Sequence, residues 1–149
     1  RAAILAVNKW DLIEKDNKTA DDFTKMLKER LARSSFVPIV FISALTGQRV
    51  QKVLGLARQV YQQHTRRIET TELNEFLRVA FGRRKPPAVQ GKFIQFKYVT
   101  QTDTAPPSFV FFASHPTLID KNYLVYLENQ LREQFGFEGV PIRIRCKEK

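Results

Sequence analysis

Two unbroken apolar runs, residues 2–7 and residues 37–42, constrain the fold of this 149-residue chain more than any other feature. Runs of this kind are typical of parallel strands that are buried on both faces. The segment between them begins with a capping-box-like pair, Thr19 and Asp22. Apolar residues then follow at helical spacing, namely Phe23, Met26, Leu27 and Leu31. Because a strand–helix–strand crossover is right-handed, we expect the ends of the two strands to lie side by side.

Polar residues follow both strands at the edge where ligands of open α/β sheets bind. The tetrapeptide Asn-Lys-Trp-Asp occupies residues 8–11, and Ser43 and Ala44 follow the second run. A carboxylate such as Asp11 can accept both N1–H and N2–H of guanine in a charge-assisted pair. Main-chain N–H groups just past a strand end can donate to the acceptor of the base. The spacing therefore favours a guanine site over two ordinary turns between a strand and a helix.

The chain divides near residue 66, at the polar and basic segment 62–67. Before this joint, helical spacing predicts a last helix that buries Val50, Val53, Leu54, Ala57 and Tyr61. After it, the pattern predicts a helix that begins near residue 70 and is capped by Gly82, strands 92–100 and 108–114, a helix over 120–135 and a strand over 141–147. This α-β-β-α-β order predicts a small α+β domain with helices on one face of its sheet.

The formal net charge of +10 favours a polyanionic partner. Both parts are basic, since residues 1–66 hold 12 Lys/Arg and 6 Asp/Glu and residues 67–149 hold 13 and 9. Strand alternation places Ile94, Phe96 and Tyr98 toward the helices. The opposite sheet face then carries Phe93, Lys97, Arg143, Arg145 and Lys147. Basic and aromatic side chains together are typical of RNA-binding surfaces, although the face can equally be solvated or covered by another domain.

A second candidate for RNA binding is the loop of Arg83, Arg84 and Lys85, whose alternative is a solvated helix terminus. The segment Gly-Phe-Glu-Gly, residues 136–139, has the letters of an RNA-gripping KH loop. It precedes the final strand rather than a second helix, so we interpret it as a helix cap followed by a turn.

Five stretches carry a family resemblance. Residues 8–12 (Asn-Lys-Trp-Asp-Leu) and 42–47 (Ile-Ser-Ala-Leu-Thr-Gly) are similar to the fourth and fifth motifs of translation-factor-like GTPases. Residues 73–77 (Leu-Asn-Glu-Phe-Leu), 106–110 (Pro-Pro-Ser-Phe-Val) and 126–137 resemble the carboxyl-terminal domain of the Der (EngA) family. That family comprises bacterial ribosome-assembly GTPases with two tandem G domains and a KH-like domain.

The resemblance implies that residues 1–66 are the end of a P-loop-type G domain and residues 67–149 a KH-like domain. It implies that Asp11 takes guanine N1–H and N2–H, Asn8 holds the loop near the base and the stem of Lys9 packs over the ring. Ser43 would brace the corner, and the Ala44 amide would meet O6. GTP or GDP is the implied ligand, and the large ribosomal subunit, its RNA and the upstream G domains are the implied partners.

The sequence contains no Gly-x-x-x-x-Gly-Lys-Ser/Thr loop and no upstream switch residues. We therefore expect no catalytic residue here, an inactive chain when isolated, and Mg²⁺ bound only through residues that precede Arg1. The single Cys146 excludes an internal disulfide, and neither histidine has a partner at metal-ligand spacing. No apolar run has the ~18 residues of a membrane span, so we expect a cytoplasmic protein. The functional alternatives are a non-catalytic RNA- or protein-binding module with a G-domain remnant, and a GTPase of another process such as tRNA modification.

Overall fold

The computed structural model describes residues 1–14, 16 and 18–148. Its contacts form two compact units. The first unit comprises Arg1–Gln63 together with Glu138–Val140, and the second comprises His64–Phe137 together with Pro141–Lys149.

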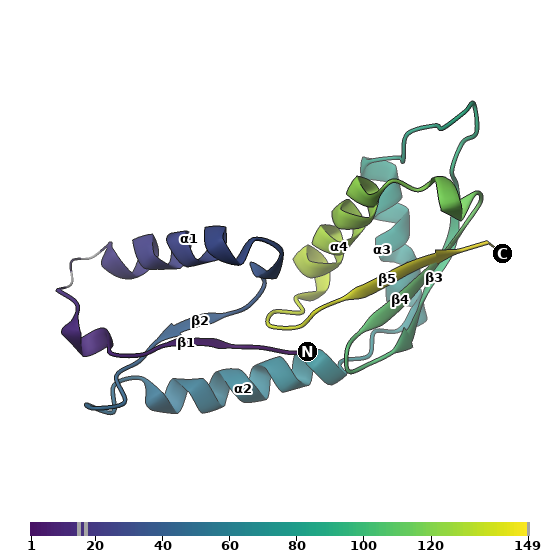
Figure 1. The fold of residues 1–149 in the computed structure, drawn as a ribbon. Coiled ribbons are helices and arrows are strands. Elements are labelled where there is room, and N and C mark those ends of the chain that lie inside the picture. Colours follow the sequence, from purple (N-terminus) through teal and green to yellow (C-terminus); the bar gives the residue numbers. More distant parts are fainter. Residues whose placement is uncertain (15, 17, 149) are drawn as a thin grey trace. The chain divides into compact units, whose positions relative to one another are not determined.

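The first unit contains the predicted parallel pair of strands. Strand β1 (Leu5–Val7) pairs with β2 (Ile39–Phe41) in parallel. The pair lies between helices α1 (Thr19–Leu31) and α2 (Val50–Thr65), as Figure 1 shows. Short 3-10 turns, η1 (Trp10–Leu12) and η2 (Ala32–Ser34), follow β1 and α1. The paired strands are shorter than the two apolar runs. The pairing begins at Leu5, whose N–H donates to the carbonyl of Pro38 at 3.0 Å.

Two local predictions for this unit were wrong. Helix α1 is not started by a Thr19–Asp22 box, because the Asp16 carboxylate accepts from the backbone N–H of Thr19 and from that of Lys18, each at 2.8 Å. In α2 only Val53 of the predicted stripe turns inward, since Val50, Leu54 and Tyr61 are 38%, 68% and 67% exposed and Ala57 is exposed as well. The side chains that turn inward are Val53, Leu56 and Val60. Helical spacing alone allowed either stripe, and packing against the strands selects the second.

The second unit has the predicted order α-β-β-α-β. Its elements are α3 (Thr70–Arg83), β3 (Phe96–Asp103), β4 (Ser108–Ala113), the 3-10 turn η3 (Pro116–Leu118), α4 (Lys121–Phe135) and β5 (Arg143–Lys147). The sheet order is β3-β4-β5, with β3–β4 antiparallel and β4–β5 parallel. Helices α3 and α4 cover one face of this sheet (Figure 1).

The core of the second unit lies between these helices and the sheet. Tyr123, Leu127 and Leu131 of α4 are at most 1% exposed, and they share one cluster with Phe76 of α3 and Phe111 of β4. Burial of about 1.5–3 kcal/mol per large apolar side chain makes this cluster the main source of stability in the unit. Helix α4 also has a true N-cap, because the Asp120 side chain accepts from the Asn122 N–H at 3.1 Å.

The end of α3 differs from the prediction. Gly82 does not cap the helix, which continues to Arg83, and the Arg84 N–H donates to the Ala80 carbonyl at 3.1 Å. Gly136 does cap α4 with a positive φ of 88°, and its N–H donates to the Arg132 carbonyl at 2.9 Å. The Gly-Phe-Glu-Gly segment is therefore a helix cap and turn, as interpreted from the sequence.

Strand β3 begins later than predicted and changes its facing at a β-bulge. Phe96 is opposite Ala113, whereas Tyr98 is opposite Phe112, so Lys97 is the extra residue. Because an extra residue reverses the alternation of side chains, Val99 enters the core and Tyr98 leaves it. The prediction that Tyr98 faces the helices was wrong for this reason.

Candidate functional site

The carboxyl ends of β1 and β2 are joined by hydrogen bonds that continue beyond the strands. The Ile42 N–H donates to the Val7 carbonyl at 2.8 Å, and the Trp10 N–H donates to the Ile42 carbonyl at 3.0 Å. The side chain of Asn8 extends the link, because its Oδ1 accepts from the Ala44 N–H at 3.0 Å. Asn8 and Ala44 are thus in direct contact although they lie 36 positions apart in the sequence.

The backbone turns sharply at Lys9. Its φ of 61° and ψ of 33° lie in the left-handed region, which a lysine adopts only when its surroundings stabilise it. Asn8 Oδ1 accepts from the Lys9 N–H at 2.8 Å, and the next residue, Trp10, is only 3% exposed. The indole packs on Phe41 with ring centroids 4.2 Å apart and meets Phe23 edge to face at 5.5 Å. This aromatic cluster fixes the turn that presents Lys9 and Asp11.

The loop that follows β2 is held by a buried hydroxyl group. Ser43 is fully buried, and its Oγ accepts from the Thr46 N–H at 3.2 Å. The Ser43 N–H donates to the Gln48 carbonyl at 3.1 Å, which closes the loop around Gly47 with its φ of 75°. The loop that carries the Ala44 amide is therefore rigidly braced from within.

Asp11 lies in η1, one residue after the buried Trp10, and is half-buried. The structure therefore joins Asn8 and Ala44 by a direct hydrogen bond, with Lys9 and Ser43 as their chain neighbours, and places Asp11 on the adjoining turn. The Ala44 N–H is engaged by Asn8, so a base acceptor at this point has to share it or take it over. The individual roles toward guanine remain predictions.

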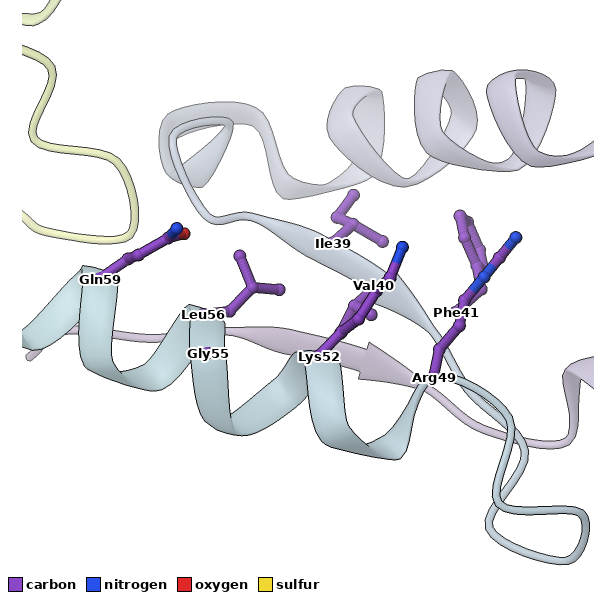
Figure 2. A pocket seen from close by; sticks show the side chains of 8 residues that line it. All are labelled: Ile39, Val40, Phe41, Arg49, Lys52, Gly55, Leu56 and Gln59. Carbon is purple, nitrogen blue, oxygen red and sulfur yellow. The ribbon is translucent and has the colours of Figure 1, made fainter.

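A hollow of about 470 Å³ in this unit lies at a different place. It lies between β2 and α2 and is lined by none of the five predicted nucleotide residues. Figure 2 shows Leu56 and Val40 in its middle and the side chains of Lys52 and Arg49 rising from the α2 side past the strand.

The predicted RNA-binding residues fall into two groups. The first surrounds the long loop between α3 and β3. Arg84 lies over the Tyr126 ring at 5.3 Å, Lys85 lies over the Phe81 ring at 6.0 Å, and Arg83 Nη1 donates to the Gln130 side chain at 3.2 Å. Phe93 is 76% exposed and lies in this loop rather than in β3.

The second group is on the sheet. Arg143, Arg145 and Lys147 alternate along β5 and are exposed, while Ile142, Ile144 and Cys146 pack against the core. Lys97, at the bulge of β3, is exposed as well. The alternation predicted for β5 is therefore confirmed.

Sequence reasoning missed two aromatic residues on the sheet face that carries Arg143, Arg145 and Lys147. Tyr98 of β3 and Phe112 of β4 are stacked, with ring centroids 4.3 Å apart and an interplanar angle of 18°. Only the bulge places Tyr98 beside Phe112, and a single extra residue has no signal in the pattern of one strand. Phe112 by contrast could have been found from the sequence. Side chains alternate along a strand, so Phe109 and Phe111 share the core side and Phe112 points to the opposite side.

Across residues 1–14, 16 and 18–148, no three His, Cys, Asp or Glu side chains are grouped so that they could hold a metal ion. None of the helices within that part of the chain is both long and apolar enough to cross a bilayer.

The two units define a class of protein, in which a parallel β-α-β-α segment is followed by a KH-like α+β unit. Residues 67–147 match the family model described as the KH-domain-like, carboxyl-terminal domain of EngA bacterial GTPase enzymes. The chain belongs to this family, Der (EngA).

Curated relatives agree over the whole chain. It is 48% identical to a GTPase Der of Chloroherpeton thalassium, 47% to one of Thermoanaerobacter sp. (strain X514) and 46% to one of Caldanaerobacter subterraneus subsp. tengcongensis. All 149 residues align in each case, and they span 34% of the length of each relative. The chain thus matches about a third of a Der protein, at its carboxyl-terminal end.

Proposed function

We propose that this chain is the nucleotide-selecting end of a G domain, residues 1–66, followed by a KH-like domain, residues 67–149. The protein to which it belongs is a GTPase of ribosome biogenesis that acts in assembly of the large subunit. Its GTP or GDP state regulates association with ribosomal RNA. The observation that carries the proposal is the hydrogen bond from the Ala44 N–H to Asn8 Oδ1, since it joins the two strand tips that guanine recognition requires.

In this proposal the chain selects the base and leaves hydrolysis to residues elsewhere in the protein. Asp11 accepts N1–H and N2–H of guanine, and the Ala44 N–H donates to O6. Asn8 and Ser43 keep the two loops in register, and the stem of Lys9 covers the ring. The donor set fits guanine, because adenine offers no paired donors and would leave the Asp11 carboxylate unmatched, at a cost of about 1–3 kcal/mol. Mg²⁺ would be bound with the phosphates by residues outside this chain.

Two features support RNA as the partner. The chain has a net charge of +10, and the exposed cations of β5 form a row on one face of the KH-like unit. A phosphate backbone is the counterpart that such a row binds with release of counterions. The upstream G domains of the same polypeptide would then control access to the RNA, in the cytoplasm.

Co-sedimentation tests this function. The intact protein is mixed with purified large ribosomal subunits in GDP or in a non-hydrolysable GTP analogue, and small subunits serve as the control. We expect association with large subunits that differs between the two nucleotides. Equal sedimentation in both nucleotides would contradict regulation by nucleotide state, and no sedimentation with either would contradict the ribosomal role.

A further inference from the structure

The sheet of the second unit has two edges, and a residue of the same unit closes one of them. Strand β3 forms this edge, and the side-chain amide of Asn74 in α3 bonds to it. Asn74 Oδ1 accepts from the Val99 N–H at 3.0 Å, and Asn74 Nδ2 donates to the Val99 carbonyl at 3.2 Å. The amide takes the place of a further strand, and covering of this kind is one way in which proteins protect a sheet edge.

The other edge, β5, is open (Figure 1). The Arg143 N–H donates to the Pro107 carbonyl at 2.9 Å, so the main-chain groups of Arg143 point toward β4. Because main-chain groups alternate along a strand, those of Ile144 and Cys146 point away from the sheet. Turn η3 lies near the same strand, but no hydrogen bond within the described residues reaches these groups. The β5 edge therefore offers free N–H and C=O groups to a further strand.

A groove of about 420 Å³ lies between α4 and β5 and is here called the α4–β5 groove. It has an apolar and a charged lining, formed respectively by Leu124, Val125, Ile142 and Ile144 and by Glu128, Arg143 and Arg145. Val125 is 54% exposed, so an apolar part of α4 is left uncovered at this groove. A strand added to β5 would place every second side chain against the apolar lining.

The charge along the β5 edge is positive. Glu128, the one carboxylate of the groove, is bonded to Arg132 at 2.7 Å. Arg143, Arg145 and Lys147 are exposed and form no ion pair within the part of the chain that the structure describes. They point away from the helices, so the other side chains of an added strand would lie beside them. Opposite charges in such cross-strand positions stabilise the pairing, and like charges oppose it.

We propose that β5 is the docking edge for an extended segment of another protein in which apolar and acidic residues alternate. The apolar residues pack in the α4–β5 groove. The acidic residues pair with the three cations of β5, and the main chain bonds to Ile144 and Cys146. In this mode of recognition, main-chain bonds give affinity and the alternate side chains give selectivity.

The charge of β5 also decides against a second copy of this chain as the occupant. Pairing of β5 with β5 would set cations opposite cations, which is destabilising. The inference goes beyond the proposed function, which assigns the same cations to RNA. A docked segment would therefore exclude RNA from β5.

The test uses the intact protein and a fluorescein-labelled peptide of eight residues in which valine and glutamate alternate. Its anisotropy should rise on binding, whereas a peptide of alternating valine and lysine should not bind, because its charges repel the cations. Two further peptides carry N-methyl groups, one on every valine and the other on every glutamate. Only one of these two sets of N–H groups faces β5 in an added strand. One methylated peptide should therefore lose binding and the other should keep it, which also gives the direction of the strand.

Val125→Glu tests the groove. It puts a carboxylate where the apolar residues of the peptide pack, and we expect binding to be about 5- to 150-fold weaker. Leu54→Glu is the matched control, because Leu54 is 68% exposed on α2 of the first unit, and this variant should bind as the unchanged protein does. Arg143→Gln/Arg145→Gln should weaken binding about 2- to 30-fold through the loss of two cross-strand charge pairs.

Three results would overturn the proposal. They are equal binding of the unmodified peptide and both methylated peptides, equal binding by Val125→Glu and the unchanged protein, and no binding of the unmodified peptide. The first result would reduce the interaction to attraction between charges. Co-sedimentation with large subunits is measured without the peptide, so either proposal can fail while the other stands. Circular dichroism of each variant checks that the fold is retained.

Discussion

At the scale of single residues, a strained backbone and hydrogen bonds occur together where β1 and β2 end. This place, residues 8–11 and 43–44, is called the strand corner below. Lys9 is held at a φ of 61°, Asn8 Oδ1 accepts two main-chain N–H groups, and Ser43 is fully buried with its hydroxyl bonded. Conformations of this kind cost of order 1–3 kcal/mol and persist where neighbouring contacts determine them. At this corner the neighbouring contacts are the packing of Trp10 on Phe41 and the bond to Ala44.

Gly139 is the residue of the first unit least able to accept a side chain. Its φ is +72°, and an added Cβ would lie 2.6 Å from Val60 Cγ2 and 3.0 Å from the Ala3 carbonyl oxygen. Its N–H donates to the Phe36 carbonyl at 2.7 Å. We predict that Gly139→Ala lowers the free energy of unfolding of this unit by about 1–3 kcal/mol.

The single tryptophan makes this measurable, because Trp10 lies in the same unit and is 3% exposed. Urea unfolding followed by its fluorescence should show a lower midpoint for Gly139→Ala. Gly55→Ala is the control, since nothing lies within 4 Å of a Cβ at this helical position and alanine should be neutral or stabilising. Equal midpoints for Gly139→Ala and the unchanged chain would contradict the prediction.

Cys146 is predicted to be an unreactive thiol. Burial raises the pKa of Cys146 from an ordinary 9.0 to about 11, so only roughly 0.1% is thiolate at pH 8. Alkylation by iodoacetamide should be slow at pH 8 and rise about tenfold per pH unit up to pH 11. Since the folded thiol holds its proton more tightly than the unfolded one, its contribution to stability is complete below pH 9 and declines above it. Labelling at the rate of a free thiol at pH 8 would contradict this.

At the scale of elements, the start of α1 depends on Asp16. The carboxylate accepts from the Thr19 hydroxyl, from the Lys18 N–H and from the Thr19 N–H, and these bonds hold the pKa of Asp16 below its ordinary 3.8. A lowered pKa means that the stabilisation is present above about pH 4 and is lost as the pH falls below that value. We predict that the first turn of α1 frays in this acidic range.

Amide hydrogen exchange of Lys18 and Thr19 measures this fraying. Relative to the intrinsic rate at each pH, exchange in the unchanged chain should accelerate as the pH falls from 5 to 3. In Asp16→Ala it should already be fast at pH 5 and should not change further. Equal protection of the two chains at pH 5 would show that another group begins the helix.

The helices and strands also show which features can be predicted from the sequence and which cannot. Periodicity predicted every major helix and strand, because apolar faces must match the period of the element that buries them. It could not predict the bulge at Lys97, since that depends on how β3 pairs with β4. It also assigned Leu54 and Tyr61 to the wrong side of α2, where two stripes were nearly equivalent. For the site, the crossover predicted that Asn8 and Ala44 would be neighbours, but not that they would bond to each other.

At the scale of the whole molecule, stability and function are distributed differently between the two units. The large aromatic core lies entirely within the second unit, whereas α1 has no buried residue. The strand corner predicted to select the nucleotide lies in the first unit, and the exposed β5 row of Arg143, Arg145 and Lys147 lies in the second. Under the proposed function, base selection belongs to the first unit and RNA contact to the second.

The most direct test of the account is the nucleotide preference of Asp11→Asn in the intact protein. The xanthine base has a carbonyl where guanine has its 2-amino group, so an amide donor at position 11 should pair with it. Competition between GDP and XDP should show the unchanged protein preferring GDP and the variant preferring XDP, a reversal of roughly 100-fold or more from two exchanged hydrogen bonds. If the variant discriminates between the two nucleotides as the unchanged protein does, the assignment of this strand corner to guanine is wrong.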